Sequence, residues 1–170
     1  RAKQSYHPHH LLAKQSARQL NQHEVDMVAL WHEVFGDDLQ SIEEFFVRIY
    51  NPSCCFTQII DNRVVAMLHI IPIEQNGMLS AYIYAVATAP QFRHRGIAHT
   101  LIEQAIESIR KVGIYDRIIL IPASSKAENL YSEFGFEMTD ECFDQSELGI
   151  DYDLGSGNNS QDVVMVRKIY

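Results

Sequence analysis

The sequence predicts a mixed α+β domain whose sheet is mostly antiparallel, and three observations lead to this fold class. Two amphipathic, helix-like segments come first, and three β-rich segments separated by short turn signals follow them. A strand–helix–strand unit comes next, and two further strand-like segments close the chain. The chain has 170 residues, of which 46% are hydrophobic, so its length suits one domain with a sizeable core.

The N-terminal residues 1–16 show no clean periodicity, and we expect them to form a tail before a single domain at residues 17–170. This tail carries His7, His9 and His10, but it has neither a carboxylate nor a cysteine to complete a metal site. A solvated tail is therefore favoured over a metal site.

Two helices are expected at the start of the domain, after a short strand around Ala17 to Leu20. Asn21, followed by Glu24 three residues later, has the pattern of a helix N-cap with an acidic third position. Ser41 and Glu44 form a second pair of this kind. Apolar residues recur at intervals of three and four after each pair, which predicts two helices that precede the sheet.

Three β-rich runs follow, at residues 54–60, 63–73 and 78–89. Asp61-Asn62 separates the first two runs and Asn76-Gly77 separates the second from the third; both pairs favour tight turns. The three runs are therefore expected to form an antiparallel meander.

The rest of the chain predicts one parallel crossover and a closing strand pair. An amphipathic helix is expected at residues 96–111, and RIILIPA at 117–123 is a short apolar run typical of a strand covered on both faces. A short helix is expected from residue 124 onwards, with strands at 136–143 and at the C-terminal VVMVRKIY.

Charge and composition exclude several classes of protein. The net charge of −8 opposes binding to nucleic acid, and no apolar run approaches the about 20 residues that span a bilayer. The chain has three cysteines without the spacing of a disulfide framework or a zinc site. We expect neither a nucleic-acid nor a membrane partner, and a cytoplasmic location.

A basic turn lies where the third β-rich run passes into the amphipathic helix. It reads TAPQFRHRGIAH and contains the spacing Arg93-x-x-Gly96-x-Ala98. The first N–H groups of a helix have no partner within the helix and together bind phosphate well. Gly96 lets a pyrophosphate approach the backbone, and Arg93 and Arg95 add positive charge. The pattern predicts an anion site, and the alternative is a solvated Arg pair at an ordinary helix start.

This turn, the strands on either side and the later motif Ala127-x-x-Leu130-Tyr131-x-x-x-Gly135 together resemble the GNAT superfamily of acyl-CoA-dependent N-acetyltransferases. The resemblance covers roughly residues 17–170. It implies a sheet of six or seven strands, about four helices and a V-shaped splay in which acetyl-CoA lies. It also implies cofactor contacts from backbone groups of Val86, Ala87 and Thr88, and from the pyrophosphate turn at Arg93, His94, Arg95, Gly96, Ile97, Ala98 and His99.

The same resemblance implies further site residues on the short helix. Tyr131 stands where relatives place a general acid, and Ala127 belongs to the same motif. Many relatives have Asn where this chain has Ser124, which either binds the pantetheine weakly or caps the helix. In relatives, a Glu on the strand before the turn often acts as the general base, and this chain has no Glu there. The candidate bases are therefore Glu74, His69 or a water chain.

The segment from Glu137 to Asp153 carries seven acidic residues and neither Lys nor Arg. It is interpreted either as a solvated loop or as a surface that attracts a cationic amine. The predicted function is acetyl transfer from acetyl-CoA to an amine, small or on a protein, by a step that needs no metal. The alternative is a non-catalytic acyl-CoA sensor, and homodimers are frequent among proteins of this kind.

Overall fold

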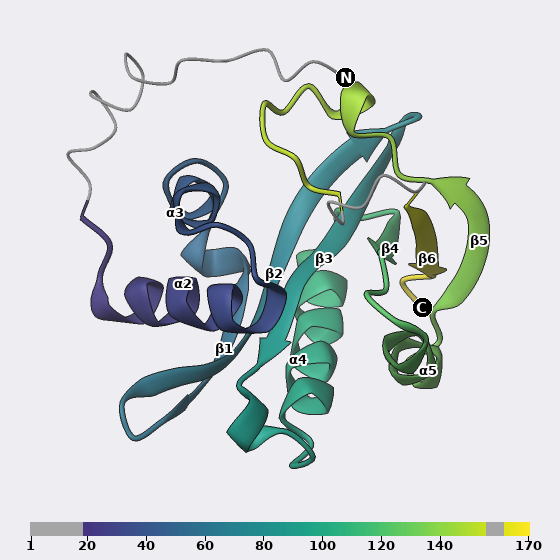
Figure 1. Ribbon diagram of the computed structural model, residues 1–170. Helices are drawn as coiled ribbons and strands as arrows, with labels where there is room; N and C mark the ends of the chain where they lie inside the picture. Colours follow the sequence, from purple (N-terminus) through teal and green to yellow (C-terminus); the bar gives the residue numbers. More distant parts are fainter. Residues whose placement is uncertain (1–18, 156–161) are drawn as a thin grey trace.

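The computed structural model describes residues 19–155 and 162–170, and the expected tail at residues 1–16 lies outside this part (Figure 1). Its helices are α2 (Gln22–Phe35), α3 (Leu39–Arg48), α4 (Ile97–Val112) and α5 (Ser125–Glu133). Its strands are β1 (Cys55–Ile60), β2 (Arg63–Gln75), β3 (Met78–Thr88), β4 (Arg117–Leu120), β5 (Glu137–Cys142) and β6 (Val163–Arg167). Short 3-10 helices lie at Pro52–Cys54, Pro90–Phe92 and Gln145–Leu148.

The described strands form one six-stranded sheet in the order β1-β2-β3-β4-β6-β5. Every neighbouring pair is antiparallel except β3 and β4, which are parallel and are joined by the crossover helix α4. This arrangement confirms the predicted α+β class with a mostly antiparallel sheet. The strand expected around Ala17 to Leu20 is not formed at Gln19 and Leu20, and the other two residues lie outside the described part.

Both predicted turns are confirmed. Asp61 and Asn62 have φ of 51° and 60°, and Asn76 and Gly77 have φ of 54° and 73°. Positive φ at both central residues is the geometry whose twist matches that of the paired strands, and Asn, Asp and Gly adopt it most readily.

The first helix begins as predicted, because the Asn21 side chain accepts a hydrogen bond from the Glu24 N–H at 2.9 Å. The second helix begins earlier than predicted. Asp38, and not Ser41, is its N-cap and accepts from the Ser41 N–H at 3.0 Å. The prediction at Ser41 was wrong because Asp38 is an equally good cap placed three residues nearer the N-terminus.

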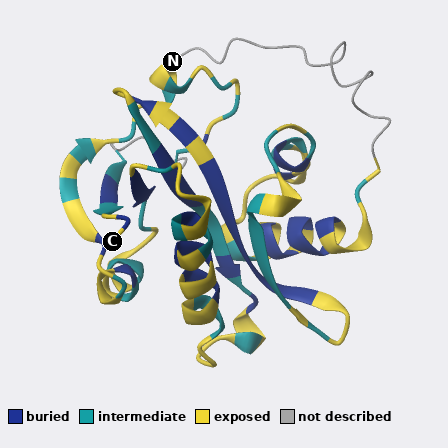
Figure 2. Ribbon diagram, turned by 180° about the vertical axis from the view of Figure 1, so that it is seen from behind, coloured by how far each residue is buried: buried dark blue, intermediate teal, exposed yellow. Residues whose placement is uncertain are grey.

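The two faces of the sheet carry separate cores. Helices α2 and α3 pack on one face around Trp31, Phe45 and Phe46, and α4 and α5 pack on the other around Leu101 and Ile102. Buried residues gather where the helices meet β2 and β3 (Figure 2). Among the described helices, none is both long enough and apolar enough to cross a membrane.

Candidate active site

Strands β3 and β4 pair over a short distance and then separate. Their only paired residues are Ser80 with Arg117, Ala81 with Ile118 and Tyr82 with Ile119. Strand β4 ends at Leu120, just before Pro122, which has no N–H to continue a ladder. The edge of β3 at residues 83–88 therefore has no strand partner on the β4 side within the described residues.

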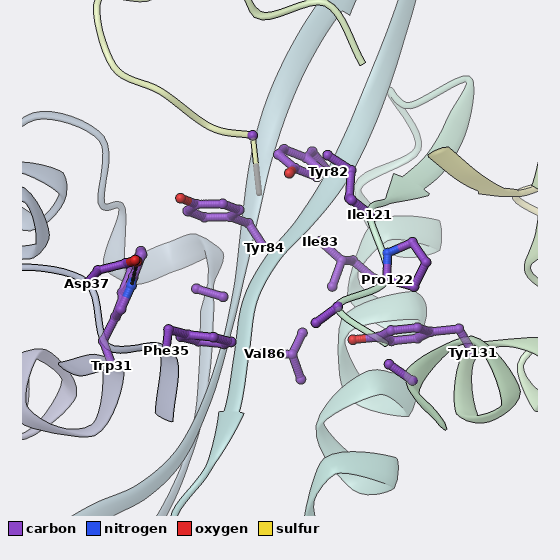
Figure 3. Close-up of a pocket in the computed structure, with 14 residues that line it drawn as sticks. Trp31, Phe35, Asp37, Tyr82, Ile83, Tyr84, Val86, Ile121, Pro122 and Tyr131 are labelled. Atoms are coloured by element: carbon purple, nitrogen blue, oxygen red, sulfur yellow. Dashed lines mark hydrogen bonds between the residues drawn. The ribbon is translucent and has the colours of Figure 1, made fainter. Parts of the chain in front are cut away.

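A cavity of about 240 Å³ lies at this separation (Figure 3). Helix α2 and the residues after it line one side, and the segment after β4 and helix α5 line the other, with β3 between them. The lining residues are Trp31, Phe35, Asp37, residues 82–86, residues 121–123, Ala127, Tyr131 and Gly155.

A β-bulge interrupts β3 beside this cavity. Met67 of β2 pairs with Ala87, whereas His69 pairs with Tyr84, so β3 has one residue more than β2 over this stretch. Ala85 takes up the difference with φ of 53°, in the left-handed region that residues with a side chain seldom adopt. As a result, Val86 lines the cavity, whereas Ala87 and Thr88 return to the ladder with β2.

The basic turn has the backbone of an anion site. His94 and Gly96 have φ of 64° and 75°, and Gly96 caps α4 without any side-chain hydrogen bond. Within the described residues, the N–H groups from His94 to His99, including those of Ile97 and Ala98, have no backbone acceptor; the first helical bond runs from the Thr100 N–H to the Gly96 oxygen. Successive unpaired N–H groups at a helix start form a concave site that suits a phosphate.

The basic side chains brace this turn. Arg93 Nε donates to the Thr88 carbonyl oxygen at 3.1 Å, and the Arg95 guanidinium lies 5.1 Å from the centre of the Phe92 ring. The His99 ring lies 4.5 Å from the Phe134 ring, between centroids, so the first turn of α4 contacts the end of α5. The predicted cofactor residues on these two helices therefore lie at one end of the splay.

Tyr131 of α5 combines a buried ring with a hydroxyl that reaches the cavity. Its side chain is 7% exposed and contacts Phe136, and the hydroxyl points across the cavity toward Val86 (Figure 3). Burial raises the pKa of Tyr131 to about 12. The hydroxyl is therefore protonated at neutral pH and can donate its proton.

Ser124 lies about two turns before Tyr131, and Ala127 lies about one turn before it. The Ser124 hydroxyl caps α5 by accepting from the Ala127 N–H at 3.1 Å, which fits the capping alternative. Ala127 lines the cavity, as Tyr131 does.

Neither candidate base lies in the cavity. His69 is 2% exposed and surrounded by rings of α2 and α3, and burial lowers its pKa from 6.5 to about 3. Glu74 is exposed near the end of β2, where it pairs with Leu79 at the opposite end of β3 from the bulge. We retain neither residue as a base.

The acidic segment packs on the same face of the sheet as α3, where the Tyr152 hydroxyl donates to the Ser41 carbonyl oxygen at 3.1 Å. The Tyr82 hydroxyl donates to the Leu154 carbonyl oxygen at 2.7 Å, and the Gln145 side chain bonds Tyr152 and Leu154 at 2.6 and 2.7 Å. Gly155 reaches the cavity. The acidic segment therefore packs near the cavity, and the chain just after it, at Gly155, lines the cavity.

Most cavity residues were not predicted as site residues, among them Trp31, Phe35, Asp37 and Tyr84. Trp31 and Phe35 followed the helical periodicity and were interpreted as core, and Tyr84 as part of a strand. Phe35 is nevertheless 39% exposed, a departure from the core pattern that only the fold reveals.

Comparison with known proteins gives the family. The model of the acetyltransferase (GNAT) family matches residues 17–136. No curated protein matches the chain in sequence.

Solved structures give the fold. A GNAT family N-acetyltransferase, YhbS, from Escherichia coli in complex with CoA has 15% identity and a TM-score of 0.65, over 89% of this chain and 79% of that one. A GNAT family acetyltransferase from Staphylococcus aureus has 14% identity and a TM-score of 0.64, over 89% and 96%. A Pyrococcus horikoshii protein has 22% identity and a TM-score of 0.56 over 68% of this chain, which spans only 40% of its length.

Proposed function

The chain belongs to the acetyltransferase (GNAT) family, and from this premise we propose that it transfers an acetyl group from acetyl-CoA to a primary amine by direct attack. The observation that carries the proposal is the cavity at the splay of β3 and β4, where the Tyr131 hydroxyl points toward Val86, the residue after the bulge at Ala85.

The cofactor end supports acetyl-CoA as the donor. The unpaired edge of β3 offers backbone groups to the amides of a pantetheine arm, as it would to an added strand. The N–H groups from His94 to His99 suit the pyrophosphate. A solved relative of the same fold is bound to CoA.

The chemical step uses the two groups that face each other across the cavity. The amine nitrogen attacks the thioester carbon and forms a C–N bond, which places negative charge on the carbonyl oxygen. A backbone N–H of residues 86–88 stabilises this oxyanion. When the C–S bond breaks, its electron pair goes to sulfur, and Tyr131 donates the proton that converts the thiolate to the free thiol. The nitrogen of the intermediate loses its extra proton as the amide forms, and this proton returns through solvent to the Tyr131 oxygen.

The amine must lose a proton, because an alkyl ammonium has a pKa near 10.4 and is not nucleophilic. The cavity supplies no carboxylate base on β3, and His69 is sequestered. The mouth beside Phe35 and Asp37 is exposed, so we assign this proton to solvent.

The test is to titrate acetyl-CoA and then follow thiol release against a panel of primary amines that includes amino acids, amino sugars, aminoglycosides, polyamines and peptides. Acetyl-CoA-dependent acetylation of at least one amine is the expected result. Tight binding of acetyl-CoA without turnover on any amine would favour a non-catalytic acyl-CoA sensor instead.

A further inference from the structure

The cavity has a second end, opposite Tyr131, where three aromatic rings and one carboxylate meet. The Trp31 ring lies 6.3 Å from that of Phe35 and 5.6 Å from that of Tyr84, between centroids. Trp31 Nε1 donates to Asp37 Oδ2 at 2.8 Å. Trp31 is 2% exposed and contacts Phe35, Asp37 and Tyr84 (Figure 3). We call Phe35, Asp37 and Tyr84 the acidic corner.

The charge of the acidic corner is negative, and no cation within residues 19–155 and 162–170 compensates it by an ion pair. Among the described residues that line the cavity, Asp37 is the only charged one. No Lys or Arg of the described residues forms an ion pair with Asp37 or with Asp153. Burial raises the pKa of Tyr84 well above its usual value, and nearby acidic groups, including both carboxylates, raise it further. The corner therefore favours a bound cation.

Aromatic faces beside a carboxylate recognise an ammonium group by two means. The carboxylate forms charge-assisted hydrogen bonds, and the rings attract a cation through their quadrupoles. An apolar lining between the corner and Tyr131, which includes Ile83 and Val86, suits a hydrocarbon chain.

The opposite end of the cavity holds the reacting group. The Tyr131 residue is 7% exposed, and its hydroxyl, which donates to no group of the described residues, is open to the cavity and free to bond a ligand there. A ligand that serves both ends must have a reacting group near Tyr131 and a cationic group near Asp37.

We propose that the acidic corner binds a second ammonium group of the acceptor, so that the acceptor is a diamine whose other amine is acetylated beside Tyr131. This inference rests on the proposed function and adds the substrate class. The held amine keeps its proton and its charge, and only the distant amine reacts.

The test compares pairs of compounds that differ by one charge. Putrescine, cadaverine and hexanediamine are each measured against the alkylamine with the same number of carbons, with kcat/KM as the readout. We expect at least one diamine to be preferred by about 3- to 10-fold, as an ion pair with a solvent-exposed carboxylate that aromatic rings flank implies. Equal kcat/KM for every pair would overturn the proposal.

Two variants test whether the preference for diamines depends on the acidic corner. Asp37→Asn removes the charge but keeps an oxygen that accepts from Trp31 Nε1, so the fold is preserved. Glu43→Gln makes the same change of charge at an exposed position of α3. The preference is expected to disappear in Asp37→Asn and to persist in Glu43→Gln. A preference that persists in Asp37→Asn would sink the assignment.

A binding measurement separates this inference from the proposed function. Calorimetry of each diamine and alkylamine with the CoA-saturated protein needs no turnover. If no amine is acetylated, the proposed function fails; a diamine preference in binding that Asp37→Asn abolishes still supports the corner. Binding without such a preference, or no diamine binding at all, contradicts it.

Discussion

Tyr131 contributes to this site through one atom. Its ring packs in the core beside Phe136, whereas its hydroxyl makes no hydrogen bond within the described residues. Tyr131→Phe therefore removes a proton donor with little effect on packing. We expect kcat to fall by about 100-fold or more, with the dissociation constant of acetyl-CoA and the melting temperature nearly unchanged. Thiol-release kinetics and thermal unfolding measure both, and an unchanged kcat would remove Tyr131 from the mechanism.

The pH profile offers a second readout for Tyr131. Because burial raises its pKa to about 12, the hydroxyl keeps its proton throughout the neutral and mildly alkaline range. Deprotonation of Tyr131 should therefore not lower kcat at any pH below about 12.

His69 makes folding sensitive to acid. It is surrounded by the rings of Trp31, Phe45, Phe46 and Tyr50, at 5.2 to 6.1 Å between centroids. Its pKa falls from 6.5 in the unfolded chain to about 3 in the folded protein. Its contribution to stability is complete above pH 6.5, and it is lost as the pH falls toward 3, by up to about 1 kcal/mol per pH unit.

Removing the imidazole tests this. In His69→Leu, the dependence of the unfolding free energy on pH should be shallower between pH 6.5 and 3 than in the wild type. Urea unfolding at several pH values measures the slope, which is independent of any loss of packing in the variant. Parallel curves for the two proteins would contradict the prediction.

At the scale of elements, helix α4 provides a matched pair of glycines. Gly96 and Gly113 cap its two ends with φ of 75° and 72°, and a Cβ at Gly96 would meet no atom within 4 Å. Any side chain strains both positions similarly, but only Gly96 lies at the anion site. Gly96→Glu is expected to abolish CoA binding, whereas Gly113→Glu should retain it at a comparable loss of stability. Calorimetry measures the affinity of each variant for CoA. Equal affinities of Gly96→Glu and Gly113→Glu would refute the assignment of the anion site.

Elements with local signals could be predicted from the sequence. The turns at Asp61-Asn62 and Asn76-Gly77 depend on residues that favour positive φ, and the anion turn depends on one contiguous motif. Helix α3 was misplaced because Asp38 and Ser41 are both good caps and only the fold selects one. Strand β4 ends before Pro122, although RIILIPA continues as an apolar run.

The candidate site could be predicted only on its cofactor side. Tyr131 and the residues from Arg93 to His99 belong to short motifs. The acidic corner joins α2, the residue after its cap and a strand, which lie far apart in sequence, and beyond Tyr84 the bulge shifts the ladder by one residue before Ala87. No short sequence pattern predicts the position of a β-bulge, so these contacts could not be predicted.

At the scale of the whole molecule, the sheet separates two tasks. Helices α4 and α5 carry the anion turn and Tyr131 on one face, and the end of α2 with Tyr84 of β3 forms the acidic corner on the other. CoA should therefore slow amide exchange at residues 83–88 and 94–99 and in α5, but not in α3. Adding a diamine should extend protection to the end of α2. Exchange measured by mass spectrometry tests this, and protection of α3 by CoA alone would contradict it.

The bulge at Ala85 also constrains how this chain can diverge during evolution. Strand β3 contains three alanines, and Ala81 and Ala87 are 0% and 3% exposed, so neighbouring side chains limit their size. Ala85 is limited by its backbone instead, because φ of 53° penalises a Cβ and most of all a branched one. Related sequences should replace Ala85 by Gly, Asn or Asp, which would be poor choices at the other two positions. Alanine in this one strand is thus selected for two different reasons, which are packing at Ala81 and Ala87 and backbone conformation at Ala85.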